Sequence, residues 1–101
     1  MYWQVESYVY YQMFNQGNVR AVIALKKSGG ADGMYIYFMT GSPIPPPVLN
    51  LAVPIAYMAY ETFANMIDML REEKPIWADI TSAGYGFVGT GNEPVGEAEG
   101  P

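Results

Sequence analysis

Most of the first forty residues alternate between apolar or aromatic and polar side chains, and this alternation constrains the fold more than any other feature. Residues 2–14 place Tyr, Val, Phe and Trp at a spacing of two. Such spacing is typical of a β-strand, because successive side chains of a strand point to opposite faces. Residues 19–27 and 34–40 repeat the pattern after short polar, glycine-containing segments. The sequence therefore predicts three consecutive antiparallel strands.

The two faces of the first strand differ in charge, and the uncharged face is assigned to the core. Its members are Trp3, Val5, Ser7, Val9, Tyr11 and Met13. A three-residue loop at 16–18 pairs Asn15 with Val19 and keeps this set beside the apolar face of the second strand. A two-residue turn would instead place it beside the basic residues of that strand. We therefore predict the three-residue loop.

Proline separates the predicted strands from a predicted helix. Residues 41–47 contain four prolines and are expected to cross the surface as an extended segment with polyproline character. Apolar side chains then recur at helical spacing at Ile55, Ala59, Phe63, Met66, Ile67 and Leu70. This stripe predicts a helix that has Asn50 as its N-cap or starts at Pro54. Lys74-Pro75 is expected to end it.

Two short strands, 76–81 and 85–90, are predicted around a turn at 82–84. From residue 91 onward the chain has three acids, no base and no aromatic residue, so a flexible acidic tail is expected at 91–101. Residues 1–90 then form a single α+β domain. The predicted order is β-β-β-α-β-β, an antiparallel meander with one helix packed on one face of the sheet.

Composition excludes several kinds of chemistry. The 101 residues include no Cys and no His, which removes disulfides, thiolate and imidazole metal ligands, and Ser-His or Cys-His catalysis. No motif places another catalytic pair, so we expect a protein that is not an enzyme and has no metal or cofactor. The net charge of −5 argues against duplex nucleic acid as a partner.

The sequence also predicts a soluble, cytoplasmic protein. The N-terminal residues lack the basic and apolar regions of a signal peptide. The longest charge-free stretch, residues 33–60, is interrupted by five prolines and cannot form one membrane-spanning helix.

Nine tyrosines are the unusual feature of the composition. Pairing Lys27 with Met34 across the second loop completes the predicted register of the three strands. One cross-strand row on the face away from the core is then Tyr8, Lys26 and Tyr35, and the next is Tyr10, Ala24 and Tyr37. The candidate binding residues are Tyr8, Tyr10, Lys26, Tyr35 and Tyr37. Tyrosine suits such a role because it tolerates water when free and contributes a large area when buried.

These residues suggest a small non-catalytic interaction module that forms a homodimer or binds a protein partner through its tyrosine-rich face. A second hypothesis is a small-molecule binding protein that uses an aromatic trough with one Lys. A third is an acidic inhibitor or accessory protein that recognises a basic partner. Two structural explanations stay open. The tyrosines could simply stabilise an exposed sheet, or the C-terminal hairpin or the proline segment could cover them.

Overall fold

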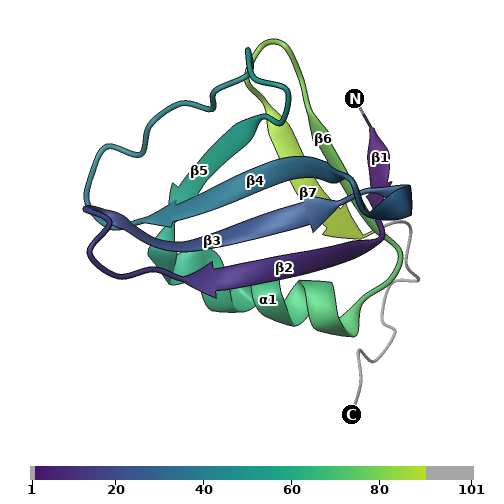
Figure 1. Ribbon diagram of the computed structural model, residues 1–101, viewed down its shortest axis with the longest axis horizontal. Helices are drawn as coiled ribbons and strands as arrows, with labels where there is room; N and C mark the ends of the chain where they lie inside the picture. The colour runs from purple at the N-terminus through teal and green to yellow at the C-terminus, as the bar shows by residue number, and fades with distance from the viewer. Residues whose placement is uncertain (1, 91–101) are drawn as a thin grey trace, which may run out of the picture.

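The computed structural model describes residues 2–90 and has an α+β fold rich in antiparallel strands (Figure 1). Its larger sheet has the order β2-β3-β4-β5, and its smaller sheet has the order β1-β6-β7. The strands are β1 (Trp3–Val5), β2 (Ser7–Gln12), β3 (Val19–Lys26), β4 (Asp32–Met39), β5 (Ile55–Ala59), β6 (Ile76–Ile80) and β7 (Gly86–Thr90). A single α-helix, α1 (Phe63–Glu72), follows β5 in the described part of the chain. The predicted fold class is confirmed.

The core lies between the larger sheet and the layer formed by α1 and the smaller sheet (Figure 1). The apolar stripe predicted for the helix is buried at Phe63, Met66, Ile67 and Leu70. The largest fully buried side chains come from β3 and β4 and are Ile23, Leu25, Ile36 and Phe38. These residues occupy alternate positions of their strands, so the predicted core faces of β3 and β4 are confirmed.

The predicted helix begins too early, because residues 55–59 form β5. This strand is parallel to β4, and the backbone N–H of Tyr35 donates to the Pro54 carbonyl at 3.0 Å. The segment fits both periods: Ile55 and Ala59 are four apart, while Ala56 and Met58 alternate and pack on the core. Pairing with β4 selects the strand over the helix at this segment. A 3-10 turn then leads into α1, which ends at Glu72, close to the predicted end.

Within residues 2–90, none of the helical segments has the length and apolar character that crossing a membrane requires.

The predicted register between the first two strands is wrong by one residue. Tyr8 lies opposite Leu25 and Tyr10 opposite Ile23, both of which are fully buried. The ladder extends past β2, where the N–H of Met13 donates to the Arg20 carbonyl at 2.8 Å. This register is the one that a two-residue turn would give. The even-numbered residues of β2 therefore face the core, and the predicted core face of this strand is inverted.

A bulge between β1 and β2 explains the inversion. The N–H of Glu6 donates to the carbonyl of Lys26, although Lys26 lies opposite Ser7 in the register. Glu6 and Ser7 thus both face Lys26 of β3, which is the geometry of a β-bulge. Before the bulge, Val5 is buried as predicted. After it, every side chain of β2 is on the face opposite to the predicted one, because a slip of one residue exchanges the two faces.

The register between β3 and β4 also differs from the prediction, by two residues. Leu25 lies opposite Met34, where the prediction placed Ile36. An irregularity between Leu25 and Lys26 adds one more residue of shift, so that Lys26 lies opposite Asp32. The backbone N–H of Lys27 donates to the Ala31 carbonyl at 2.8 Å, so the loop is tighter than expected. A slip of two keeps each side chain on its face. The faces are therefore correct, but the neighbours across the strands change.

Gly86 is needed where β7 approaches β6. A Cβ at this position would meet the backbone carbonyl oxygen of Asp79 well inside contact distance. Gly86→Ala is therefore expected to lower the free energy of unfolding by about 1–3 kcal/mol, as overpacking does. Gly89→Ala is the matched control in the same strand, because its Cβ would lie 4.0 Å from the nearest atom, a ring carbon of Phe87. Urea unfolding of both variants checks the prediction, and equal losses would contradict it.

Candidate functional site

The candidate site is the face of the larger sheet that points away from α1, here called the outer face. Its residues are Val9 and Tyr11 from β2, Val22, Ala24 and Lys26 from β3, Asp32, Tyr35, Tyr37 and Met39 from β4, and Ile55 and Tyr57 from β5. Three of the five predicted site residues, Lys26, Tyr35 and Tyr37, lie on it. The C-terminal hairpin β6–β7 does not cover it, because Ile76, Ala78 and Val88 pack on the core side.

Tyr8 and Tyr10 do not belong to the outer face, which corrects the predicted site. Both point toward the core side, as their pairing with Leu25 and Ile23 requires. The ring of Tyr10 meets Phe63 of α1 edge to face at 5.9 Å between centroids, and Tyr8 packs against the core cluster. Tyr10 therefore helps to hold the helix against the sheet, and the ring of Tyr8 stacks beside it at 6.4 Å.

The centre of the outer face consists of two cross-strand rows without a charged residue. The first row is Val9, Ala24, Tyr35 and Ile55, and the second is Tyr11, Val22, Tyr37 and Tyr57. Ala24 is 6% exposed, whereas Val9 and Tyr11 at the β2 edge are 38% and 55% exposed. The Tyr37 and Tyr57 rings meet edge to face at 5.7 Å. The rows form an aromatic and aliphatic surface across four strands.

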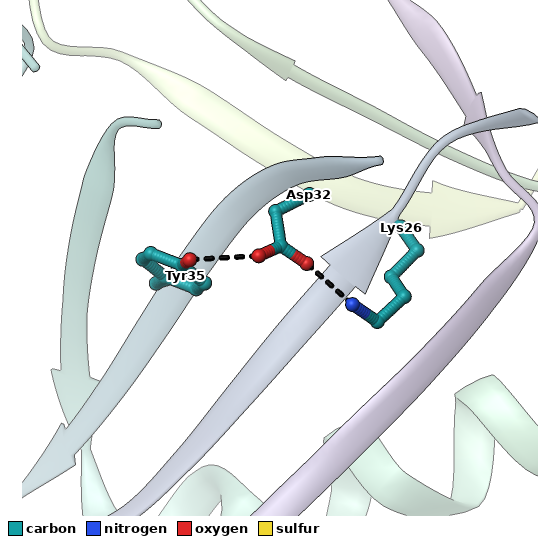
Figure 2. A network of polar contacts seen from close by, with 3 residues as sticks. All are labelled: Lys26, Asp32 and Tyr35. Carbon is teal, nitrogen blue, oxygen red and sulfur yellow. Dashed lines mark hydrogen bonds and ion pairs between the residues drawn. The ribbon is translucent and has the colours of Figure 1, made fainter. Parts of the chain in front are cut away.

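At one end of the rows, Lys26, Asp32 and Tyr35 form a network (Figure 2). The Lys26 Nζ donates to Asp32 Oδ1 at 2.6 Å, and the Tyr35 hydroxyl donates to Asp32 Oδ2 at 2.7 Å. The hydrogen bond from Lys26, followed by the one from Tyr35, lowers the pKa of Asp32. The same carboxylate raises the pKa of Tyr35, because the hydrogen bond holds the tyrosine in its protonated form.

This network predicts a loss of stability in acid. The pKa of Asp32 is lower in the folded protein than in the unfolded chain, where it is about 3.9. Its contribution is therefore fully present above that value and is lost as the pH falls through the folded pKa. Asp32→Asn should flatten the decline in unfolding free energy between pH 5 and pH 2. Asp68→Asn, the same change on the exposed side of α1, should keep the wild-type decline, and identical profiles for both variants would contradict the prediction.

A cleft of about 390 Å³ opens between the two sheets on the other side of β4 and β5. Its apolar walls come from Met34, Ile36, Ala56, Met58, Met66 and Val88. Asp79 also lines it, so the cleft suits a small, mainly apolar molecule with a polar group. It does not contain the predicted trough residue Lys26, which lies on the outer face and is bound to Asp32.

A second aromatic group lies on the smaller sheet and was missed by the sequence analysis. Tyr2 stacks on Trp77 with centroids 4.9 Å apart and an interplanar angle of 8°, and it also contacts Phe87 at 6.0 Å. Tyr2, which directly precedes β1, is far in the sequence from Trp77 of β6 and Phe87 of β7. The pairing of β1 with β6 brings them together, and no local pattern indicates that pairing.

Within residues 2–90, no three acidic side chains lie close enough to form a metal site. Comparison of the chain with protein-family models, with curated proteins and with solved structures found no match.

Proposed function

We propose that this protein is a non-catalytic interaction module that assembles with copies of itself through the outer face. One observation carries the proposal: two adjacent rows of uncharged, aromatic and aliphatic side chains cross four strands on the side away from α1. Tyrosine is enriched at protein interfaces, where a rigid ring contributes area and its hydroxyl can bond at the rim. A contiguous apolar surface of this kind is the usual mark of an interaction site.

The charges at the edge of the outer face support a second copy as the partner. The Lys26 ammonium and the Asp32 carboxylate are 2.6 Å apart and neutralise each other. A copy rotated by a two-fold axis would place uncharged rows against uncharged rows. The same pair argues against an anionic ligand at Lys26, because the ligand would have to displace Asp32.

Light scattering coupled to size-exclusion chromatography tests the proposal. The wild-type protein should have a molar mass of at least two chains, and this mass should persist at high salt because an apolar interface is not screened. A mass of one chain at every concentration and salt would contradict the proposal. Assembly that vanishes at high salt would point to a charged interface instead.

A further inference from the structure

The free edge of β2 offers a second interaction surface, one that uses the backbone and does not depend on the outer face. β2 ends the sheet order, so its only strand neighbour within residues 2–90 is β3 (Figure 1). We propose that β2 pairs antiparallel with β2 of a second copy, about a two-fold axis at Tyr10. The partner is an identical, uncharged, extended strand.

The hydrogen bonds to β3 fix which backbone groups are available at this edge. The N–H of Met13 donates to the carbonyl of Arg20, the residue opposite it in the register. In an antiparallel ladder such bonded pairs alternate with unbonded ones. Tyr8, Tyr10 and Gln12 therefore direct their N–H and C=O groups away from β3. These groups form the template that an added strand requires.

The bulge at Glu6–Ser7 and the charge of Glu6 lie at the start of β2, but the rest of the β2 edge lacks the features that normally prevent pairing. Edge strands in natural proteins are usually protected by charge, proline, bulges or short length. Residues 7–19 contain no charged residue and no proline, and five of the six residues of β2 are exposed. By contrast, the free side of β5 is occupied at Ile55, which exchanges backbone hydrogen bonds of 2.9 and 3.0 Å with Val48. β1 has only three residues.

A two-fold axis at Tyr10 makes β2 complementary to its own copy. Tyr10 lies opposite Tyr10 of the second copy, and Tyr8 lies opposite Gln12 of the second copy, so that all the outward backbone groups are paired. On the outer face, Val9 then lies beside Tyr11 of the second copy. Pairs of an aromatic and a β-branched residue stabilise adjacent strands. The pairing would join two outer faces into one continuous surface.

The experiment is carried out in the Tyr37→Glu background, which places a charge in the outer face and separates the two surfaces. Gln12→Pro removes one outward N–H, and proline is tolerated where an edge N–H faces solvent. Gln12→Ala shortens the same side chain but keeps the N–H, so it is the matched control. Molar mass is measured for both double variants, and near-ultraviolet circular dichroism checks their folding. Amide hydrogen exchange at Tyr8, Tyr10 and Gln12 is followed in the parent Tyr37→Glu protein over a range of concentrations.

The proposal expects a dimer for Tyr37→Glu that survives Gln12→Ala and is lost in Gln12→Pro. Exchange at the three amides should slow as the concentration rises. Rapid exchange at all concentrations, protection that is independent of concentration, or equal assembly of the two Gln12 variants would overturn the edge pairing. A monomeric Tyr37→Glu protein beside an assembled wild type would also overturn it, while leaving the outer-face proposal intact. If the wild type and the Tyr37→Glu protein form the same edge-paired dimer, the outer-face proposal is contradicted instead.

Discussion

Replacing Phe38 with Ala should lower the free energy of unfolding by about 3–5 kcal/mol, the range for a large aromatic side chain removed from a packed core. Phe38 is 0% exposed, and its ring meets Phe63 edge to face at 5.1 Å. The substitution leaves a cavity between β4 and the start of α1 and removes this ring contact. Urea unfolding followed by far-ultraviolet circular dichroism measures the loss.

Phe14→Ala is the matched control for this substitution. The chemical change is the same, but Phe14 is 82% exposed. Phe14→Ala should lower the free energy of unfolding by no more than about 0.5 kcal/mol, as surface substitutions usually do. Comparable destabilisation of the two variants would show that the core does not lie between the larger sheet and α1.

Tyr37→Glu should weaken assembly of the wild-type protein by about thirtyfold in Kd, which corresponds to about 2 kcal/mol at an interface hot spot. Tyr37 lies in the second row of the outer face, between Val22 and Tyr57, and its ring contacts the Tyr57 ring. A carboxylate at this position would have to be desolvated against apolar side chains of the second copy. Sedimentation equilibrium over a dilution series measures the change.

Tyr85→Glu makes the same change on a tyrosine that is 76% exposed between β6 and β7, away from the outer face. Assembly of this control should match the wild type. An equal effect of the two substitutions would mean that added negative charge, rather than its position, weakens assembly. Unchanged far-ultraviolet spectra would show that both variants keep their fold.

Local patterns in the sequence were sufficient where one element determines its own buried face. Phe63, Met66 and Leu70 are buried because a helix of any origin would place them on one side. The same reasoning holds for β3, where Ile23 and Leu25 alternate within a single uninterrupted strand. The α+β class follows from these elements and does not depend on their exact partners.

The candidate site could be predicted only in part, because it depends on register. One bulge at Glu6–Ser7 exchanged the faces of β2, which removed Tyr8 and Tyr10 from the outer face and added Tyr11. No residue type in this segment marks the bulge. The predicted register likewise placed Lys26 between two tyrosines. The two-residue shift of β4, together with an irregularity between Leu25 and Lys26, brings Asp32 to it instead.

Tyr57 was missed for a different reason. Residues 55–59 satisfy a helical stripe as well as a strand, and only pairing with β4 makes them part of the larger sheet. Parallel pairing links segments separated by a long crossing, so a pattern within one segment cannot reveal it. The outer face therefore contains a tyrosine pair, Tyr37 and Tyr57, that the alternation alone did not indicate.

The most direct test of the outer face as an assembly surface is an isotope-filtered NMR experiment on a mixture of labelled and unlabelled copies. Only contacts between copies give signals in this experiment. The outer-face interface predicts intermolecular contacts from the Tyr37 and Tyr57 rings to the methyl groups of Val22 and Ile55. An assembly whose intermolecular contacts come from α1 or the smaller sheet, with none from these rings, would contradict it.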